Sequence, residues 1–245
     1  CGRFSLVATA EDIEALFGVD GVEAFPPRYN IAPTQPILAI VAAVRPEPGS
    51  NRPERRALLL RWGFIPSWAK DIKALPLLIN ARSETAAEKN SFRAAIRRRR
   101  MLVPASGFYE WRRSGEKKSQ PFWIRPRAGG LVAFGGLMET WMSPDGSEID
   151  TGAILTTGPN AEIAPIHDRM PVVIPPDDWR RWLDRDVDDA ARIADLLRPA
   201  PDGFFEAIPV SDKVNKVANA GPDLQAPLEG ASAPAPLRGA QGSLF

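Results

Sequence analysis

Cysteine and histidine are almost absent from this sequence, which has one of each, Cys1 and His167. A single cysteine cannot form an intramolecular disulfide, so the chain suits a reducing compartment. Structural zinc needs about four Cys or His ligands, and we expect neither a metal nor another cofactor. Any thiol or imidazole chemistry in the protein must therefore use these two residues.

Long apolar runs are also missing. No stretch approaches the roughly 20 residues needed to span a bilayer, and no signal-peptide segment opens the chain, so we expect a cytoplasmic protein. The net charge of +1 does not by itself indicate a nucleic-acid-binding protein. Arginine far outnumbers lysine, and its planar fork suits phosphates and bases. Because a GC-rich genome also enriches arginine, the charge permits DNA binding without requiring it.

The chain of 245 residues, 44% of them hydrophobic, can bury a substantial core. Strand and helix patterns are intermixed without regular βαβ alternation, which predicts one α+β domain with a curved, barrel-like, mostly antiparallel sheet and peripheral helices. Thr9 and Thr85 are typical helix caps, the latter with Glu88 in a capping box. Helices are expected at 9–18, 85–98, 177–183 and 187–197, and strands at 2–7, 37–44, 57–62, 101–103, 107–111, 121–125, 131–137, 152–156 and 171–174.

The composition changes after Gly221. Residues 222–240 are rich in Pro, Ala and Gly and have little to bury, which predicts a disordered tail behind a domain of residues 1–221. The last five residues resemble the Gln-x-x-Leu-Phe peptides with which bacterial repair and replication proteins bind the sliding clamp. Leu244 and Phe245 would fill an apolar pocket while Gln241 forms a hydrogen bond beside it. A disordered end without a partner is the alternative.

The chain begins with Cys1 and not with methionine. We expect that an initiator methionine has been removed, which leaves a free α-amine. A trimmed chain and a lipidated cysteine are alternatives, although the strand pattern of residues 2–7 argues against the flexible tether of a lipoprotein. A free N-terminal cysteine carries an amine and a thiol on adjacent carbons, so it can convert an aldehyde into an imine and then a thiazolidine ring. The same residue could attack an amide, as in hydrolases with N-terminal nucleophiles.

Two further segments offer polar groups next to apolar strands. A hydrophobic strand over 76–79 leads into a predicted turn with Asn80 and Arg82, just before the helix cap at Thr85. An amide, a guanidinium and helix N-terminal amides together could hold a phosphate or a sugar oxygen. In the strand over 107–111, Glu110 lies among apolar residues and could exchange a proton with an amine or a hydroxyl. A plain capped turn and a surface carboxylate are the respective alternatives.

His167 lies between Ile166 and Asp168 in a loop closed by Pro171, a setting that favours general acid or base chemistry near neutral pH. Trp68 and Trp111 lie close to basic residues in the sequence. Aromatic rings that stack on bases, interleaved with cations, are typical of single-stranded nucleic-acid binding. Packing in the core is the alternative for either tryptophan.

Together these segments resemble the SRAP family (SOS-response-associated peptidase domain), in the family's order and over about residues 1–221. The matching stretches are CGRF at 1–4, YNIAPT at 29–34, RWGFIPSW at 61–68, NARSET at 80–85, GFYEW at 107–111 and IHDRMP at 166–171. The resemblance implies a compact, β-rich α+β fold. It also implies a monomer that forms a thiazolidine cross-link with abasic sites in single-stranded DNA and so shields the lesion at replication forks.

The resemblance also implies roles for residues at the matching positions. Cys1 would form the cross-link, Asn80 would position the sugar and Cys1, Glu110 would move protons and orient the amine, and His167 would assist ring opening and release. The DNA path would be lined by Arg3, Asn30, Trp68, Arg82, Trp111 and Arg169. Met170 stands where other members carry a second arginine, which would weaken backbone contacts there. A Cys-dependent peptidase, including one that removes its own initiator methionine, and a non-catalytic single-stranded DNA adaptor remain open.

Overall fold

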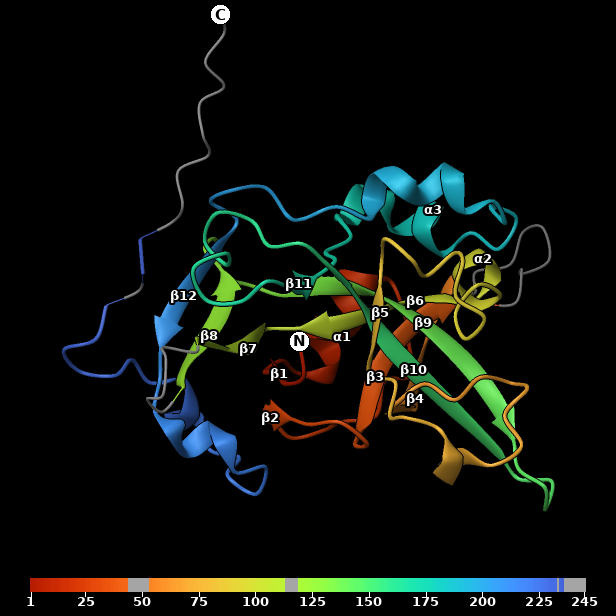
Figure 1. Cartoon of the computed structure of the whole chain (residues 1–245), viewed down its shortest axis with the longest axis horizontal. Helices are drawn as coiled ribbons and strands as arrows, with labels where there is room; N and C mark the ends of the chain where they lie inside the picture. The colour runs from red at the N-terminus through yellow and green to blue at the C-terminus, as the bar shows by residue number, and fades with distance from the viewer. Residues whose placement is uncertain (44–52, 113–118, 233, 236–245) are drawn as a thin grey trace, which may run out of the picture.

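Two β-sheets meet at the first strand of the chain (Figure 1). The structure is a computed structural model that describes residues 1–43, 53–112, 119–232 and 234–235. One sheet has five strands in the order β12-β8-β7-β1-β2, and every pairing in it is antiparallel. Its strands are β1 (Phe4–Leu6), β2 (Arg28–Ile31), β7 (Gly107–Arg112), β8 (Gln120–Pro126) and β12 (Phe205–Pro209).

The second sheet closes on itself. Strand β10 pairs with β9 as well as with β4, so β10, β4, β3, β6 and β9 form a closed barrel. The strands of this sheet are β3 (Pro36–Ala42), β4 (Arg55–Trp62), β5 (Asn80–Arg82), β6 (Arg100–Ala105), β9 (Val132–Met142), β10 (Glu148–Thr157) and β11 (Met170–Pro171). β10 runs parallel to β4 and β5, and the other pairings are antiparallel. The predicted α+β class with a barrel-like, mostly antiparallel sheet is confirmed.

A glycine lets the barrel close tightly. A side-chain carbon added at Gly152 of β10 would lie 2.5 Å from Cε of Met101 and 2.9 Å from Cδ1 of Leu60. Contacts this short do not occur between carbon atoms, so a larger residue would require the buried side chains of Met101 and Leu60 to move. Gly152 therefore permits the close approach between β10 and the side chains that fill the barrel.

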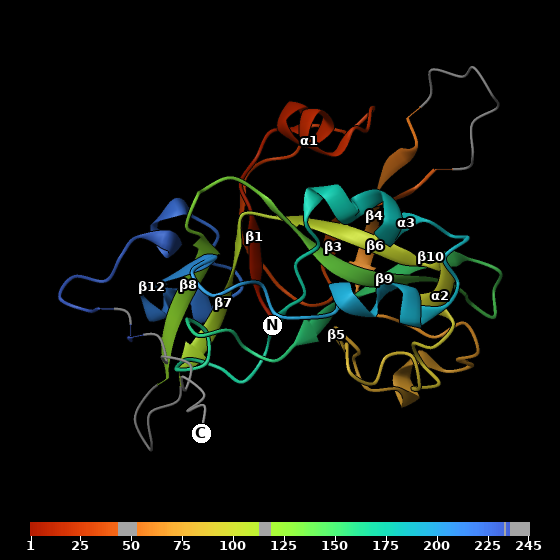
Figure 2. The same cartoon turned by 90° about the horizontal axis from the view of Figure 1, so that it is seen from above.

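Aromatic rings join the two sheets. Phe4 of β1 lies edge-on to Trp62 of β4, with ring centroids 5.2 Å apart, and to Phe134 of β9 at 6.3 Å. Phe108 of β7 packs against the same Phe134 at 6.0 Å. All four rings are almost fully buried. This edge-to-face packing adds to the burial of apolar area, and it holds β1 at the junction of the sheets. In Figure 2, β1 runs between α1 at one end and the N-terminus at the other.

The first predicted helix is confirmed. Helix α1 (Ala10–Phe17) begins after Thr9, whose hydroxyl accepts a hydrogen bond from the backbone of Asp12, and ends at Gly18 with a φ of 62°. The helices predicted near 177–197 are shorter or tighter than expected. They are the 3-10 turn η2 (Pro176–Asp178), α3 (Trp179–Leu183) and the 3-10 helix η3 (Ala190–Leu196).

The predicted helix at 85–98 is wrong over most of its length. Only α2 (Ala95–Arg98) is α-helical, and residues 83–94 form consecutive turns. Thr85 caps no helix, because its hydroxyl is buried without a hydrogen-bond partner among the described residues. Asn90 and Ser91 compete with helical hydrogen bonding through their side chains. Tertiary packing also decides here, since Phe92 is buried against Phe64 with ring centroids 5.1 Å apart.

Several other boundaries differ from the prediction. Strand β11 contains only the first of the residues expected at 171–174, and the strand β12 was not predicted. Residues 222–227 differ from the expected tail. Pro222–Gln225 form the 3-10 turn η5, where Leu224 is 1% exposed against Tyr109 and Trp123, and Pro227 pairs with Val210. Two short 3-10 turns complete the elements, η1 (Ile72–Ala74) and η4 (Asp212–Asn215).

Two predicted features lie outside the described residues: the end of the strand at residue 44, and the terminal residues Gln241, Leu244 and Phe245. In the part of the chain that the structure describes, every helix is too short or too polar to cross a membrane.

Arg100 ties the helical layer to the barrel. It begins β6, is 4% exposed, and its guanidinium lies over the ring of Trp182 at 5.7 Å. Burial lowers its pKa to about 10, so the group stays protonated at neutral pH. The charge is compensated by carbonyl oxygens that accept its hydrogen bonds, those of Ile96, Arg97, Trp182, Asp184 and Val187.

We predict that Arg100→Met lowers the free energy of unfolding by about 3 kcal/mol or more, because the substitution leaves buried carbonyls without donors. Urea denaturation followed by tryptophan fluorescence measures the change. Arg97→Met, three residues earlier and exposed, is the matched control and should change stability little. Equal stability of the Arg100 variant and the control would contradict the structural role of Arg100.

Candidate active site around Cys1

Cys1 lies at the wall of a pocket of about 350 Å³ where the two sheets meet. Its side chain is buried. The other lining residues come from the start of β5, the turns after it, the end of β10 and the loop before β11. They are Leu78, Asn80, Arg82, Lys89, Phe92, Thr156, His167, Asp168 and Arg169.

The α-amine of Cys1 forms an ion pair with Glu110. The nitrogen lies 2.9 Å from Oε1 of the carboxylate, and Glu110 is 4% exposed. The pairing of β1 with β7 produces this contact, because Phe4 lies opposite Phe108 and the backbone N–H of Tyr109 donates to the carbonyl of Arg3. A buried carboxylate is costly unless a charge compensates it, and the chain terminus supplies that charge.

Asn80 fixes the carbonyl end of Cys1. Its Nδ2 donates a hydrogen bond of 2.9 Å to the Cys1 carbonyl, while its Oδ1 is buried and has no hydrogen-bond partner among the described residues. The predicted turn at Asn80 and Arg82 is wrong, because both residues belong to β5. They pair in parallel with Ile154 and Thr156 of β10. This strand pairing, absent from the local sequence pattern, presents Asn80 to Cys1.

His167 reaches the same carboxylate from the opposite side. Its Nε2 lies 3.6 Å from Oε2 of Glu110, and its Nδ1 accepts a hydrogen bond of 3.0 Å from the backbone N–H of Arg169. Asp168 Oδ1 lies 3.4 Å from the same Nδ1. The structure thus brings together all four residues predicted to do chemistry: Cys1, Asn80, Glu110 and His167.

The predicted DNA-contacting residues fall into two groups. Arg82 is exposed at the pocket, and Trp68 is 51% exposed on the segment before β5. Arg169 lines the pocket, but its guanidinium forms two hydrogen bonds with Glu84, at 2.7 and 2.8 Å, and one of 2.6 Å with the carbonyl of Thr156. Glu84 was not predicted as a site residue, although it lies within the NARSET stretch.

The second group, Arg3, Asn30 and Trp111, holds the segment 212–219. Arg3 donates to Oδ1 of Asn30 at 2.8 Å and to the carbonyl of Val214 at 2.7 Å, and it lies over the ring of Trp111 at 5.9 Å. Trp111 Nε1 donates to Asn215. Asn30 is 6% exposed, and its Nδ2 donates to the carbonyls of Val214, Lys216 and Asn219. Both ends of the Asn30 amide are thus engaged within the protein.

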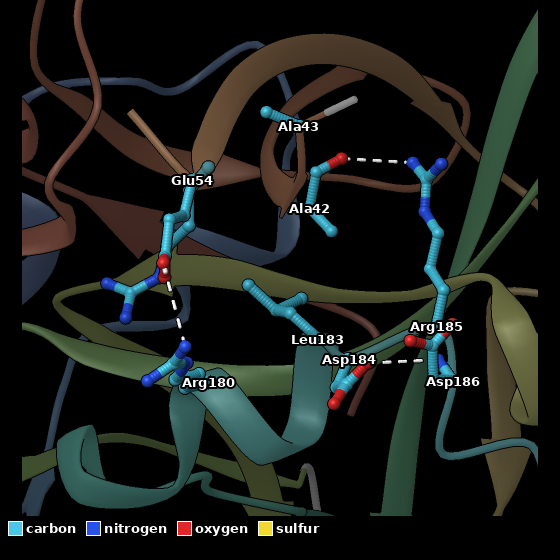
Figure 3. A pocket seen from close by; sticks show the side chains of 9 residues that line it. Ala42, Ala43, Glu54, Arg180, Leu183, Asp184, Arg185 and Asp186 are labelled. Carbon is cyan, nitrogen blue, oxygen red and sulfur yellow. Dashed lines mark hydrogen bonds and ion pairs between the residues drawn. The ribbon is translucent and has the colours of Figure 1, made fainter. Parts of the chain in front are cut away.

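A separate pocket of about 190 Å³ lies between the start of β4 and the end of α3 (Figure 3). Arg185 extends across it to donate a hydrogen bond of 2.9 Å to the carbonyl of Ala42, and Arg180 pairs with Glu54 at 3.7 Å. Its cations therefore already have partners within the protein. Among residues 1–43, 53–112, 119–232 and 234–235, no three His, Cys, Asp or Glu side chains are grouped to hold a metal ion.

A closed barrel joined to a second sheet, with the α-amine of a cysteine, an amide, a carboxylate and an imidazole at the junction, defines the class of α+β protein to which this chain belongs. The profile of the SOS response associated peptidase (SRAP) family matches residues 1–217, and the chain belongs to this family.

Relatives and solved structures agree with this assignment. The abasic site processing protein YoqW of Bacillus subtilis is 40% identical over 227 residues, which cover 91% of this chain and 98% of YoqW. The abasic site processing protein YedK of Escherichia coli is 33% identical over 237 residues, 93% of this chain and 100% of YedK. A crystal structure of a Bacteroides thetaiotaomicron protein superimposes with a TM-score of 0.79 at 25% identity, over 93% of this chain and 100% of that one.

The hydrogen bonds of Asn30 yield a stability prediction. Asn30→Ala removes the donor shared by three carbonyls and should lower the free energy of unfolding by about 1–3 kcal/mol. Hydrogen exchange should become faster in residues 212–219, and mass spectrometry of peptides would measure it. Asn219→Ala, which removes only the bond to the carbonyl of Lys213, is the control. Unchanged exchange in the Asn30 variant would contradict its role as the anchor of this segment.

Proposed function

We propose that this protein recognises abasic sites in single-stranded DNA and forms a covalent bond to them through Cys1. One observation carries the proposal: the α-amine and the side chain of a cysteine lie together in a pocket with Asn80, Glu110 and His167 around them. The relatives named abasic site processing proteins support it, because they match nearly the whole chain.

The reaction requires a free α-amine on Cys1. The ring-opened sugar of an abasic site presents an aldehyde, whose carbon is attacked by the amine nitrogen. Loss of water gives an imine, and the thiol then adds across the C=N bond: sulfur bonds to the former aldehyde carbon and the thiol proton goes to nitrogen. The product is a thiazolidine ring, and one water is released overall. A five-membered ring is harder to reverse than a simple imine.

Glu110 serves as the proton carrier of this sequence. It lies 2.9 Å from the α-amine, so its carboxylate can take a proton from the ammonium and leave the amine nucleophilic. The same proton can then pass to the hydroxyl that departs as water. The carboxylate thus accepts a proton in one step and gives it back in a later step. It must therefore lie close to the amine.

Asn80 and His167 act on the sugar. The unpartnered Oδ1 of Asn80 can accept a hydrogen bond from a sugar hydroxyl, while its Nδ2 holds Cys1. His167 lines the same pocket and is one-third exposed, so it can reach both the solvent and the ring oxygen. An imidazole there can protonate that oxygen as the ring opens and can assist the reverse reaction.

DNA would approach over the exposed groups around the pocket. Arg82 and Lys89 are cations at its rim, and Trp68 offers a half-exposed ring. Backbone phosphates pair with the cations and bases stack on the ring, a combination that binds single strands without sequence preference. Arg169 is also part of this surface, although Glu84 occupies its guanidinium in the free protein.

We predict that single-stranded DNA with one abasic site forms a band of reduced mobility with this protein, and that the band survives heating in denaturant without a reductant. Cys1→Ala and Cys1→Ser should both abolish it because neither variant has a thiol to close the thiazolidine ring. Both keep the α-amine and should still give an imine, which appears as a band only after borohydride reduction. One glycine added before Cys1 should also abolish the stable band.

Intact DNA of the same sequence is the control, and mass spectrometry checks that Cys1 is the first residue. Strong binding without a covalent band would favour a non-catalytic adaptor. Cleavage of peptide substrates without any cross-link would favour a cysteine hydrolase with His167 as its base.

The proposal also includes a protein partner, which the last five residues of the chain would bind. Gln241, Leu244 and Phe245 are proposed to bind the bacterial sliding clamp and so bring the domain to replication forks. Deletion of residues 241–245 should abolish binding to the purified clamp in surface plasmon resonance and leave cross-linking to a free oligonucleotide unchanged. Clamp binding that survives the deletion would refute this part of the proposal.

A further inference from the structure

Glu84 and Arg169 connect the two chain segments that carry Asn80 and His167. Glu84 follows β5 by two residues, and Arg169 precedes β11. The guanidinium of Arg169 binds both carboxylate oxygens of Glu84, at 2.7 and 2.8 Å, and donates to the carbonyl of Thr156 at 2.6 Å. The Arg169 side chain is only 17% exposed. A bidentate pair of this kind is geometrically specific and stronger than a single contact.

The backbone of Arg169 sets the state of the His167 ring. Its N–H donates to Nδ1 at 3.0 Å, which favours a neutral ring with its proton on Nε2, the nitrogen that faces Glu110. Two acceptors near Nδ1 favour the other form, namely the carbonyl of the same Arg169 at 3.1 Å and Oδ1 of Asp168 at 3.4 Å. The form that the ring adopts therefore depends on whether the backbone of Arg169 directs its N–H or its carbonyl at Nδ1.

We propose that Glu84 and Arg169 are positioning residues that hold His167 in the Nε2–H form, directed at Glu110. The pair anchors the side chain of Arg169, and the anchored residue presents its N–H to the ring. The catalytic consequence rests on the function proposed above, whereas the effect on the ring exists in the free protein. A hydrogen bond from Arg169 holds the pKa of Glu84 below its ordinary value, as expected for a carboxylate that stays ionised in this pair.

A competing role for Arg169 is contact with a DNA phosphate. In that case Glu84 would only compete with the phosphate, and its removal would free the guanidinium and strengthen DNA binding. The ring of His167 would not respond in the absence of DNA. The two roles therefore differ in what Glu84→Gln does to the protein alone.

The test uses the only histidine in the chain. In the full-length protein labelled with ¹⁵N, a two-bond ¹H–¹⁵N spectrum contains a single imidazole and distinguishes a protonated Nε2 from a protonated Nδ1. The wild type should show the Nε2–H form above the pH at which the ring is charged. Glu84→Gln and Arg169→Lys should each give a mixture of both forms, because Lys keeps the charge but lacks the planar fork.

Glu88→Gln removes an exposed carboxylate four residues further along and should leave the spectrum unchanged. Backbone amide spectra check that each variant is folded. An unchanged His167 pattern in the folded variants overturns the proposal. A change in Arg169→Lys alone would overturn the role of Glu84. Tighter binding of unmodified single-stranded DNA by Glu84→Gln, with an unaltered ring, would assign Arg169 to phosphate contact.

A kinetic measurement tests whether the state of the His167 ring affects the release of the cross-link. If His167 assists release, Glu84→Gln should slow the loss of the preformed cross-link roughly tenfold, while the Glu88→Gln control should match the wild type. Absence of a cross-link in the wild type would reject the proposed function but leave the NMR result valid. An altered ring with an unaltered release rate would reject the catalytic consequence alone.

Discussion

The position of Phe4 determines where the chain terminus lies. Its ring is enclosed by Trp62 and Phe134 of the barrel, and its backbone pairs with β2 on one side and β7 on the other. Three residues separate it from the N-terminus, so Cys1 has almost no freedom once Phe4 is buried. The contacts of the site, from Glu110 on β7 to Asn80 on β5, therefore form around a terminus that the aromatic core holds in place.

The charge of the site also depends on the chain terminus. Glu110 is buried, and its two oxygens face different groups, the α-amine of Cys1 and the ring of His167. The carboxylate is thereby stabilised by a charge that belongs to the end of the chain and not to a side chain. This arrangement makes the amine as important to the site as the thiol.

Local patterns predicted much of the fold and the identity of the central residues. The cap of α1, the apolar strand around Glu110 and the rarity of cysteine and histidine are all local properties of the sequence. The failures involve long-range pairing. Asn80 reads as a turn until β10 is known to lie beside it, and Thr85 reads as a helix cap until Phe92 is known to be buried. Asn30 and Glu84 acquire their roles only from partners distant in sequence, at Val214 and Arg169.

The pairing of β1 with β7 also determines when the contacts of Cys1 can form during synthesis. Residue 110 must leave the ribosome before the α-amine can find its carboxylate, and residue 167 must follow before the pocket is complete. Contacts between such distant parts of a chain form slowly. Until then Cys1 lacks the neighbours that enclose it in the folded protein. The segment that carries Cys1 is thus made before the residues that enclose it.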